Sequence, residues 1–297
     1  YISGLWADPS RADQINYRLD TMKSATVEDM MSMQLYQTSQ FAKDILPYIL
    51  GTEEGKESRH VKRAYQFLKS WDFVEDVDSE AALVFNVIVK NLVFNLYGDE
   101  ISLLGDSYLE AFSGINYLIT RRLREDIKEG KSTWVDDVRT IDKREEIREI
   151  IKSSVLDAIS EIDQKFGGNW SNWKWGDAHS LTHKHLFYKN KFINWLFDLS
   201  VGPYRSGGSN KTPNAGGFSL TKPYKQTAGA SMRRIVDFSN LNETRFILPT
   251  GQSGLPSSPH YRDQAELYHK GSYRKTWFSE AYIKSEKTFM HLKLIPR

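Results

Sequence analysis

The sequence predicts an α+β fold in which the helices come first and the strands come late. Apolar residues recur at helical spacing through most of the first two thirds of the chain. A glycine-rich segment follows at residues 202–229, and short runs typical of strands come after it. We therefore expect a mainly helical region over residues 1–175 and a strand-rich region over residues 176–297.

The first two helices have recognisable start signals. Asp8 is placed to cap a helix whose first residue is Pro9, where the missing N–H costs nothing. Thr26 is placed to cap the next helix, with two acidic residues in its first turn. Apolar residues continue at helical spacing up to Ile49, and Pro47 is expected to kink or end this helix.

Three further helices are predicted downstream. The stretch from Ser79 to Tyr97 is apolar nearly all round, which indicates a helix buried on every side. The longest strongly apolar run, near Ala81 to Val89, is shorter than the about 20 residues that span a bilayer. Amphipathic stripes at Tyr108 to Leu123 and Ile147 to Ile162 predict two more helices, the second ending at Gly167.

The late part of the chain reads differently. Residues 202–229 contain six of the 19 glycines, which predicts a long flexible connection. Arg234 to Phe238 and Arg245 to Leu248 are predicted strands. At the end of the chain, Met290, Leu292 and Leu294 alternate with polar residues, which predicts a half-buried strand.

Composition and charge narrow the class of protein. The chain has 297 residues, of which 40% are hydrophobic and 26% charged, and this excludes global disorder. Its 40 Lys and Arg against 38 Asp and Glu give a formal net charge of +2, which argues against a nucleic-acid partner. With no cysteine, the chain has no disulfide, thiolate nucleophile or cysteine-based zinc site.

Three histidines, His179, His183 and His185, lie close together in the sequence. On a strand, His183 and His185 would share one face, as two metal ligands do. The alternative is polar residues on the wet face of a strand, and Asp177 is the one obvious carboxylate neighbour. A metallohydrolase built on these histidines is a hypothesis, but we assign no metal site.

The segment Gly251-Gln252-Ser253-Gly254 is similar to a nucleophile elbow but lacks the final spacing of G-x-S-x-G. His260 and Asp263 follow within ten residues. A triad on so short a stretch is disfavoured, because its members normally come from separate loops. We interpret the glycines as a tight turn between a strand and a loop.

Four tryptophans suggest a second class of function. Trp170, Trp173 and Trp175 cluster, and Trp195 lies beyond them. An aromatic platform of this kind would suit a stand-alone binding module, but core packing is the favoured interpretation. The basic groups on the predicted helices lie among acidic residues and indicate solvated faces.

Several short sequence segments occur in an order and at spacings that together indicate a family. They are Trp6-Ala7-Asp8-Pro9-Ser10-Arg11-Ala12-Asp13-Gln14-Ile15, Thr26-Val27-Glu28-Asp29-Met30, Trp71-Asp72, Trp175-Gly176-Asp177-Ala178-His179, Gly229-Ala230-Ser231-Met232-Arg233, Pro249-Thr250-Gly251-Gln252-Ser253-Gly254 and Ser258-Pro259-His260-Tyr261-Arg262-Asp263-Gln264. Each is weak alone. Together, over nearly the whole chain, they resemble the C-terminal part of the β subunit of the penicillin acylase family.

The resemblance implies an N-terminal nucleophile hydrolase with an αββα sandwich, of which this chain supplies a helical region and late strands. Members of that family are secreted or periplasmic amidases whose precursor cuts itself and exposes a serine at the start of the β chain. The serine hydroxyl attacks an amide carbonyl with its own α-amino group as the base, and a backbone N–H and an Asn side chain stabilise the oxyanion. We therefore expect a periplasmic or secreted N-acyl amidohydrolase acting on a linear amide.

The resemblance also implies that the chain works as part of an assembly. Tyr1 cannot serve as the nucleophile, and the family's serine, oxyanion Asn and calcium-binding carboxylates all fall upstream of it. The expected partners are the α subunit, the N-terminal part of the β subunit and a small-molecule amide, with no nucleic acid and no membrane. No cofactor is expected in this chain, although calcium is possible in the complete enzyme.

One functional residue carries over by resemblance. Arg11 matches an arginine that lies near the active site of penicillin acylases and supports the nucleophile and the oxyanion Asn. An arginine suits that role because it stays charged and donates several hydrogen bonds in a fixed fork. The alternative is a surface arginine with Asp8 and Asp13 nearby. Substrate-binding residues are not assigned.

Overall fold

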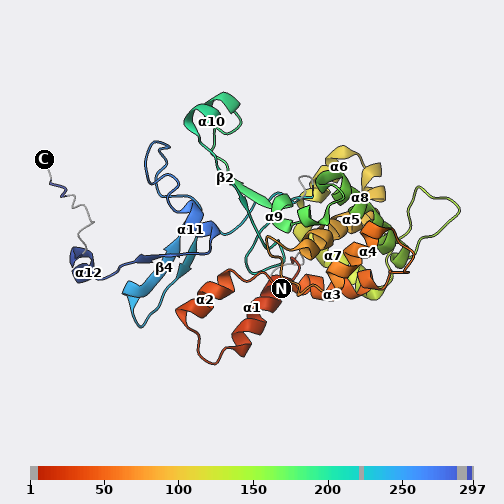
Figure 1. The fold of residues 1–297 in the computed structure, drawn as a ribbon, viewed down its shortest axis with the longest axis horizontal. Helices are drawn as coiled ribbons and strands as arrows, with labels where there is room; N and C mark the ends of the chain where they lie inside the picture. Colours follow the sequence, from red (N-terminus) through yellow and green to blue (C-terminus); the bar gives the residue numbers. More distant parts are fainter. Residues whose placement is uncertain (1–5, 221–223, 286–292, 296–297) are drawn as a thin grey trace. The chain divides into compact units, whose positions relative to one another are not determined.

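The structure is a computed structural model that describes residues 6–220, 224–285 and 293–295, without the side chains of residues 116 and 117. Figure 1 shows its elements in chain order. It divides into two compact units, and each is discontinuous in sequence. Unit 1 comprises Tyr1–Lys23, Leu35–Thr182 and Gly202–Gly229, whereas unit 2 comprises Ser24–Gln34, His183–Val201 and Ala230–Arg297.

This division differs from the expected boundary between residues 175 and 176. The chain leaves unit 1 twice and returns, so no single cut separates the helices from the strands. The glycine-rich segment, which was expected in the strand-rich region, belongs to the helical unit.

Unit 1 is built around one long buried helix. Its helices are α1 Ser10–Thr21, α3 Gln40–Leu50, α4 Arg59–Lys69, α5 Glu80–Leu103, α6 Asp106–Gly114, α7 Asn116–Glu129, α8 Ile147–Phe166 and α9 Trp175–Ala178. Figure 1 shows α5 among the other helices of this bundle. The Ser79 hydroxyl caps α5 by accepting from the backbone N–H of Ala82 at 3.1 Å. The buried helix predicted from Ser79 to Tyr97 is thus present and extends six residues further.

The core explains why α5 has no polar face. Val84, Phe85, Ile88 and Leu92 are completely buried against neighbouring helices, chiefly α8. Each such side chain contributes about 1.5–3 kcal/mol relative to an exposed one. At 24 residues, α5 is long and apolar enough to cross a membrane by length and composition alone, which the short apolar run in the sequence did not predict. In the structure, 72% of its most apolar window is buried inside the fold.

Two predicted helices are each divided in the structure. The one expected from Thr26 to Ile49 is α2 Val27–Gln34 and α3, because Ser39 starts a new helix by accepting from the N–H of Ala42 at 3.2 Å. Pro47 lies inside α3, which continues to Leu50. The stripe from residue 108 to residue 123 is α6 and α7, with the break at residue 115.

Unit 2 contains a small antiparallel sheet. Its strands are β3 Arg233–Ile235, β4 Thr244–Ile247 and β5 Arg274–Thr276, in the order β3-β4-β5. Arg234 lies opposite Phe246, and Phe246 lies opposite Arg274. The helices α2, α10 Lys191–Phe197, α11 Ala265–His269 and α12 Glu280–Ser285 belong to this unit. The side-chain amide of Gln34 ties α2 to β3 by donating to the carbonyl of Arg234 at 3.1 Å.

The predicted strands are short in the structure. The first ends at Ile235 rather than Phe238, because the Asp237 carboxylate turns the chain by accepting from the N–H of Ser239 at 2.9 Å. The second is β4. The predicted strand from Met290 to Leu294 lies largely outside the described residues. Strands β1 Ser180–His183 and β2 Val201–Arg205 form a separate two-stranded sheet.

The glycine-rich segment is packed and hydrogen-bonded, which corrects the expectation of a flexible connection. A Cβ on Gly208, where φ is +73°, would lie 2.3 Å from the carbonyl oxygen of Asn214. A Cβ on Gly216 would lie 2.6 Å from Nε2 of His179. These glycines therefore permit a close approach of backbone to the core, which the sequence alone cannot distinguish from flexibility.

We expect Gly208→Ala to destabilise the protein by about 2–4 kcal/mol, because the new methyl group combines backbone strain with a backbone clash. Gly114→Ala is the matched control, since a Cβ there meets no atom within 4 Å. Urea unfolding measures both. Equal midpoints for the two variants would contradict the close packing of this segment.

Candidate functional site

Arg11 lies in the first turn of α1, with its guanidinium on the glycine-rich segment of unit 1. One terminal nitrogen donates to the carbonyl oxygen of Asn210 at 2.8 Å. The start of α1 is ordered by Asp8, whose carboxylate accepts from the N–H of Ser10 at 3.0 Å. Ser10 and Gln14, which lie one turn apart on the adjacent face of the helix, are buried. Arg11 therefore occupies a defined position with an exposed side chain.

The loop that receives Arg11 is held by its own polar side chains. The Thr212 hydroxyl accepts from the N–H of Ser209 at 2.9 Å and donates to the carbonyl of Asn214 at 2.8 Å. The Ser209 hydroxyl accepts from the N–H of Lys211 at 3.2 Å. These side-chain bonds replace a regular ladder and fix the carbonyl of Asn210.

Two ionisable side chains are buried at this loop: Glu75, which lies against it, and Lys211, which belongs to it. Glu75 is fully buried, and the N–H of Gly208 donates to its carbonyl at 2.7 Å. Burial raises the pKa of the Glu75 carboxyl, while the charge of Lys211 and the neighbouring Ser209, Ser39 and Asn86 act against that rise. Burial likewise lowers the pKa of the Lys211 ammonium, opposed by the charges of Glu75 and Asp8.

A second polar network fixes α1 against α3 and α7. Arg124 contacts the carboxylate of Asp8 at 3.2 Å and that of Asp44 at 3.1 Å. Lys128 contacts Asp44 at 2.9 Å. Although burial raises the pKa of Asp44, the hydrogen bonds from Lys128 and Gln40 and the charges of Lys128 and Arg124 outweigh it, so the pKa is lowered. The helix that presents Arg11 is thus anchored through its acidic N-terminus.

The segment from Trp175 to His179 also contacts the glycine-rich segment. The Trp175 indole N–H donates to the carbonyl of Gly208 at 3.0 Å. The rings of Trp175 and His179 stack, with centroids 4.5 Å apart and planes 6° from parallel. His179 Nδ1 lies 2.5 Å from the carbonyl of Tyr224 and therefore carries the proton in that contact. Nε2, which faces Gly216, has no hydrogen-bond partner in the described part of the chain.

The structure does not bring the three candidate histidines together as a metal site. His179 is buried in unit 1, whereas His183 and His185 belong to unit 2. His183 Nε2 lies 3.2 Å from Nε2 of His269. Among the described residues, no group of three His, Cys, Asp or Glu could hold a metal ion. His179 acts as a packing residue that donates one hydrogen bond.

The Ser253 loop does not form a triad. The Ser253 hydroxyl accepts from the N–H of Leu255 at 3.1 Å, while His260 Nδ1 lies 3.1 Å from the Asp263 carboxylate. It is the backbone carbonyl of His260, not its ring, that accepts from the N–H of Ser253 at 3.1 Å. The Gln264 side chain accepts from the N–H of Leu248 at 3.0 Å, so the segment closes the end of β4.

Most of the tryptophan cluster is core. Trp173 and Trp175 are completely buried, and Trp170 packs against the core with Arg59 over its ring at 4.8 Å. These residues cannot form an open platform for a ligand. Trp195, by contrast, is exposed and belongs to unit 2.

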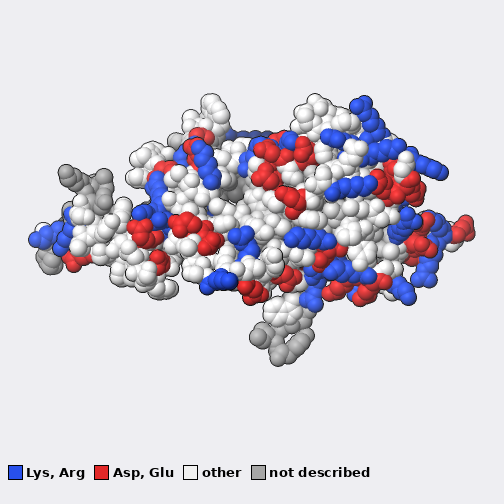
Figure 2. Space-filling model, turned by 60° about the horizontal axis from the view of Figure 1, so that its bottom comes forward, with Lys and Arg blue, Asp and Glu red and all other residues white. Residues whose placement is uncertain are grey.

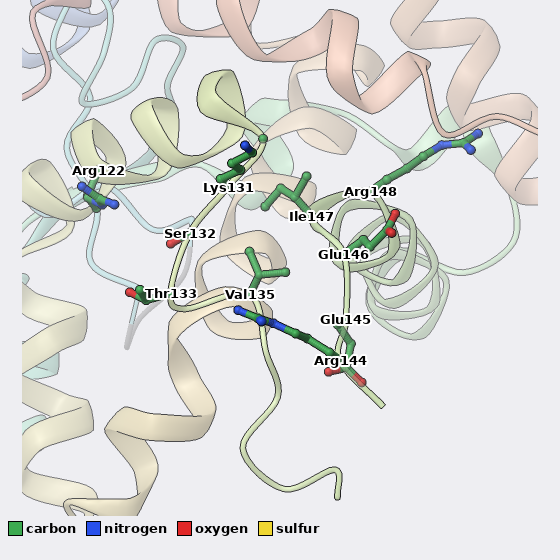
Figure 3. Close-up of a pocket in the computed structure, with 11 residues that line it drawn as sticks. Arg122, Lys131, Ser132, Thr133, Val135, Arg144, Glu145, Glu146, Ile147 and Arg148 are labelled. Carbon is green, nitrogen blue, oxygen red and sulfur yellow. The ribbon is translucent and has the colours of Figure 1, made fainter. Parts of the chain in front are cut away.

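A pocket of about 640 Å³ opens between the end of α7 and the start of α8 (Figure 3). Four of the side chains around it are basic: Arg122, Lys131, Arg144 and Arg148. Arg122 is already paired with Asp126, and the N-terminus of α8 is capped by the carboxylate of Glu146. The pocket therefore has no free helix terminus for an anion.

On the face drawn in Figure 2, the described residues form no large patch of one charge, because acidic and basic side chains are interspersed.

The fold is similar to that of a solved penicillin acylase. A solved structure, the thermostable penicillin G acylase from Alcaligenes faecalis, is similar to all of this chain with a TM-score of 0.57, covering 54% of that chain. At 15% identity this similarity shows only that the two proteins share their fold over the matched part. The strands among the described residues form one two-stranded sheet and one three-stranded sheet, so the expected αββα sandwich stays a prediction.

The chain belongs to the penicillin amidase family, whose sequence profile matches residues 1–285. This confirms the resemblance predicted from the sequence. An acyl-homoserine lactone acylase, QuiP of Pseudomonas aeruginosa, is 26% identical over 92% of this chain and 35% of its own length. The penicillin acylase 2 proenzyme of a Pseudomonas species is 24% identical over 86% of this chain and 31% of its own length. The chain thus spans about a third of the curated relatives that it matches.

Sequence reasoning missed the groups around Arg11. Asn210 and Lys211 lie in a stretch whose composition predicts a loop, and Glu75 lies in the acidic run after Trp71. In neither stretch do apolar residues recur at a helix or strand spacing that would signal burial. A buried Lys and a buried Glu become apparent only when the structure shows that both side chains are removed from water.

Burial lowers the pKa of His179 to about 4, because the charged imidazolium loses its hydration. Between pH 6.5 and pH 4 the unfolded chain therefore binds a proton that the folded chain rejects. We expect the titration of His179 alone to lower the free energy of unfolding by about 3 kcal/mol over this range as the pH falls.

The His179→Gln variant is expected to be less stable at pH 7 but to have a shallower decline toward pH 4. Urea unfolding at a series of pH values measures the slope. Gly114→Ala, which changes no titratable group and whose Cβ would meet no atom within 4 Å, serves as the control and should keep the wild-type slope. An unchanged slope in His179→Gln would show that this histidine does not titrate as described.

Proposed function

We propose that this chain is part of an N-acyl amidohydrolase that cleaves a linear amide with a serine nucleophile located upstream of Tyr1. The family match over residues 1–285 carries this proposal. In the proposed reaction, the serine hydroxyl attacks the amide carbonyl and the amine departs with a proton. Water then releases the carboxylic acid from the acyl-serine and restores the hydroxyl.

Arg11 is the residue of this chain that we assign to the reaction, as a positioning residue. Its bond to the carbonyl of Asn210 uses one N–H of the guanidinium, and the other N–H groups are donors that can serve parts of the enzyme outside this chain. In the proposal, those donors orient the nucleophile and the oxyanion Asn. The anchored start of α1 supports such a role, because a positioning group needs a fixed base.

We propose an acyl-homoserine lactone as the first substrate to test and a penicillin as the second, after the names of the two curated relatives described above. The proposed partners are the α subunit and the N-terminal part of the β subunit. The proposed compartment is the periplasm or the exterior of the cell, and calcium is a proposed component of the complete enzyme.

The complete protein that contains this chain should release free amine from its substrate. The assay uses acyl-homoserine lactones of short and long acyl chains, together with penicillin G, and follows the free amine by fluorescamine. Phenylmethylsulfonyl fluoride, which modifies nucleophilic serines, should abolish the activity. Absence of amide hydrolysis across the panel in folded, fully processed protein would contradict the proposal.

We expect Arg11→Lys in the complete protein to lower kcat by up to about 100-fold with little change in KM, because a misplaced nucleophile loses transition-state stabilisation rather than substrate affinity. Arg11→Ala should be lower still. The matched control is Arg18→Lys, on the same helix, where the guanidinium lies over the Tyr36 ring at 4.3 Å. Equal kcat values for Arg11→Lys and Arg18→Lys would remove Arg11 from the reaction.

A further inference from the structure

Unit 2 exposes a dense apolar surface at the turn between β1 and β2, where Figure 1 shows α10 at the end of an extended hairpin. We call it the aromatic tip and define it by the exposed side chains of Leu186, Phe187, Phe192, Trp195, Leu196 and Phe197. Leu186 is 91% exposed and Trp195 is 76% exposed. Exposed apolar surface this concentrated is uncommon on a solvated protein face and marks an interaction site.

The aromatic tip is presented on a fixed helix. The Asn190 side chain caps α10 by accepting from the N–H of Ile193 at 3.1 Å. At the other end, Asp198 adopts the left-handed conformation, with φ at 46°, and ends the helix. Phe192 and Trp195 lie one turn apart, with ring centroids 6.3 Å apart. The apolar side chains are therefore displayed together rather than scattered along a loop.

Both stems of the hairpin are anchored within unit 2. Arg262 contacts the Asp198 carboxylate at 2.6 Å and donates to its backbone carbonyl, also at 2.6 Å. The Tyr261 hydroxyl donates to the carbonyl of Leu199. On the other stem, His183 contacts His269. A surface held in place before binding loses less entropy when a partner docks, which suits an interface.

The charge around the aromatic tip has one sign. No acidic residue occurs between Asp177 and Asp198, whereas Lys184, Lys189 and Lys191 do. Asp198 itself is paired with Arg262. A suitable partner therefore offers an apolar recess with carboxylates at its rim. A second copy of the same tip is disfavoured, because it would bring like charges together.

We infer that the aromatic tip is the docking surface for the part of the same acylase that lies upstream of Tyr1. This inference rests on the proposed function, since it requires the remaining acylase chains. The size of the missing part supports it: the chain covers 35% of its acyl-homoserine lactone acylase relative, so most of the relative's length lies outside the matched region. Burial of six large apolar side chains would be a major share of the contact between the two parts.

Photo-crosslinking in the complete protein tests the inference. The photoreactive residue p-benzoylphenylalanine replaces Trp195 or, separately, Phe192, and the crosslinked peptides are identified by mass spectrometry. Glu266, an exposed residue of α11 in the same unit, is the control position. We expect peptides from upstream of Tyr1 at positions 192 and 195, in at least tenfold higher yield than at position 266.

The absence of cysteine from this chain provides a second measurement that needs smaller changes. Phe192→Cys and Trp195→Cys should react with a maleimide at least tenfold more slowly than Glu266→Cys in the native complete protein. Denaturation should make the three rates equal. This measurement decides the matter if a photoreactive variant fails to fold.

Several outcomes would overturn the inference. They are crosslinks to residues 1–297 of a second copy in an isotope-mixed sample, crosslinks to added phosphatidylglycerol vesicles, and no crosslink or maleimide protection above the control. Amide hydrolysis by the wild-type protein is measured in parallel. Hydrolysis with an unprotected tip overturns the inference alone, whereas a protected tip without hydrolysis overturns the proposed function alone.

Discussion

The close approach of the glycine-rich segment to the buried Trp175–His179 pair is the constraint on which the helical unit depends. The stacked rings fill the space beside the segment, and the indole N–H and the imidazole Nδ1 each bond a backbone carbonyl of it. Gly216 leaves room for the imidazole because it has no Cβ. The segment is thereby fixed to the core by two hydrogen bonds and by aromatic packing, to which its own Phe218 and Tyr224 contribute.

That constraint determines where the polar groups of the unit can lie. Once Gly208 is fixed against Trp175 and Glu75, the following residues form a tight loop closed by Ser209 and Thr212. The loop brings Lys211 into the interior and turns the carbonyl of Asn210 toward Arg11. Burial shifts the pKa of Glu75 and that of Lys211 toward their neutral forms, and the charge of each group opposes the shift of the other. The position of Arg11 is in this sense a consequence of core packing.

The sequence predicted the elements whose signal is local. Ser79 and the apolar run after it predicted α5, and Gly167 marked the end of α8, where its φ is +75°. The family assignment came from ordered short segments, several of which now have physical explanations: Trp175 and His179 hold the glycine-rich segment, and Arg262 clamps Asp198.

The features that escaped prediction depend on contacts between distant residues. A glycine-rich sequence predicts a flexible segment when the spatial neighbours of the glycines are unknown. In the structure, Gly208 and Gly216 are points of close packing. Glu75 and Lys211 are separated by more than a hundred residues in the sequence, and no periodic pattern can signal that both are buried. The two discontinuous units likewise follow from the returns of the chain at residues 35 and 202, not from any change in composition.

Native-state hydrogen exchange of the glycine-rich segment tests the central claim most directly. The N–H groups of Gly208, Asn214, Gly216 and Gly217 all donate to backbone carbonyls, at 2.7, 2.8, 3.0 and 2.8 Å. The account predicts that these four amides exchange as slowly as those in the middle of α5, because they open only when the unit unfolds. Exchange as fast as that of an exposed loop would contradict it and would leave Arg11 without a fixed acceptor.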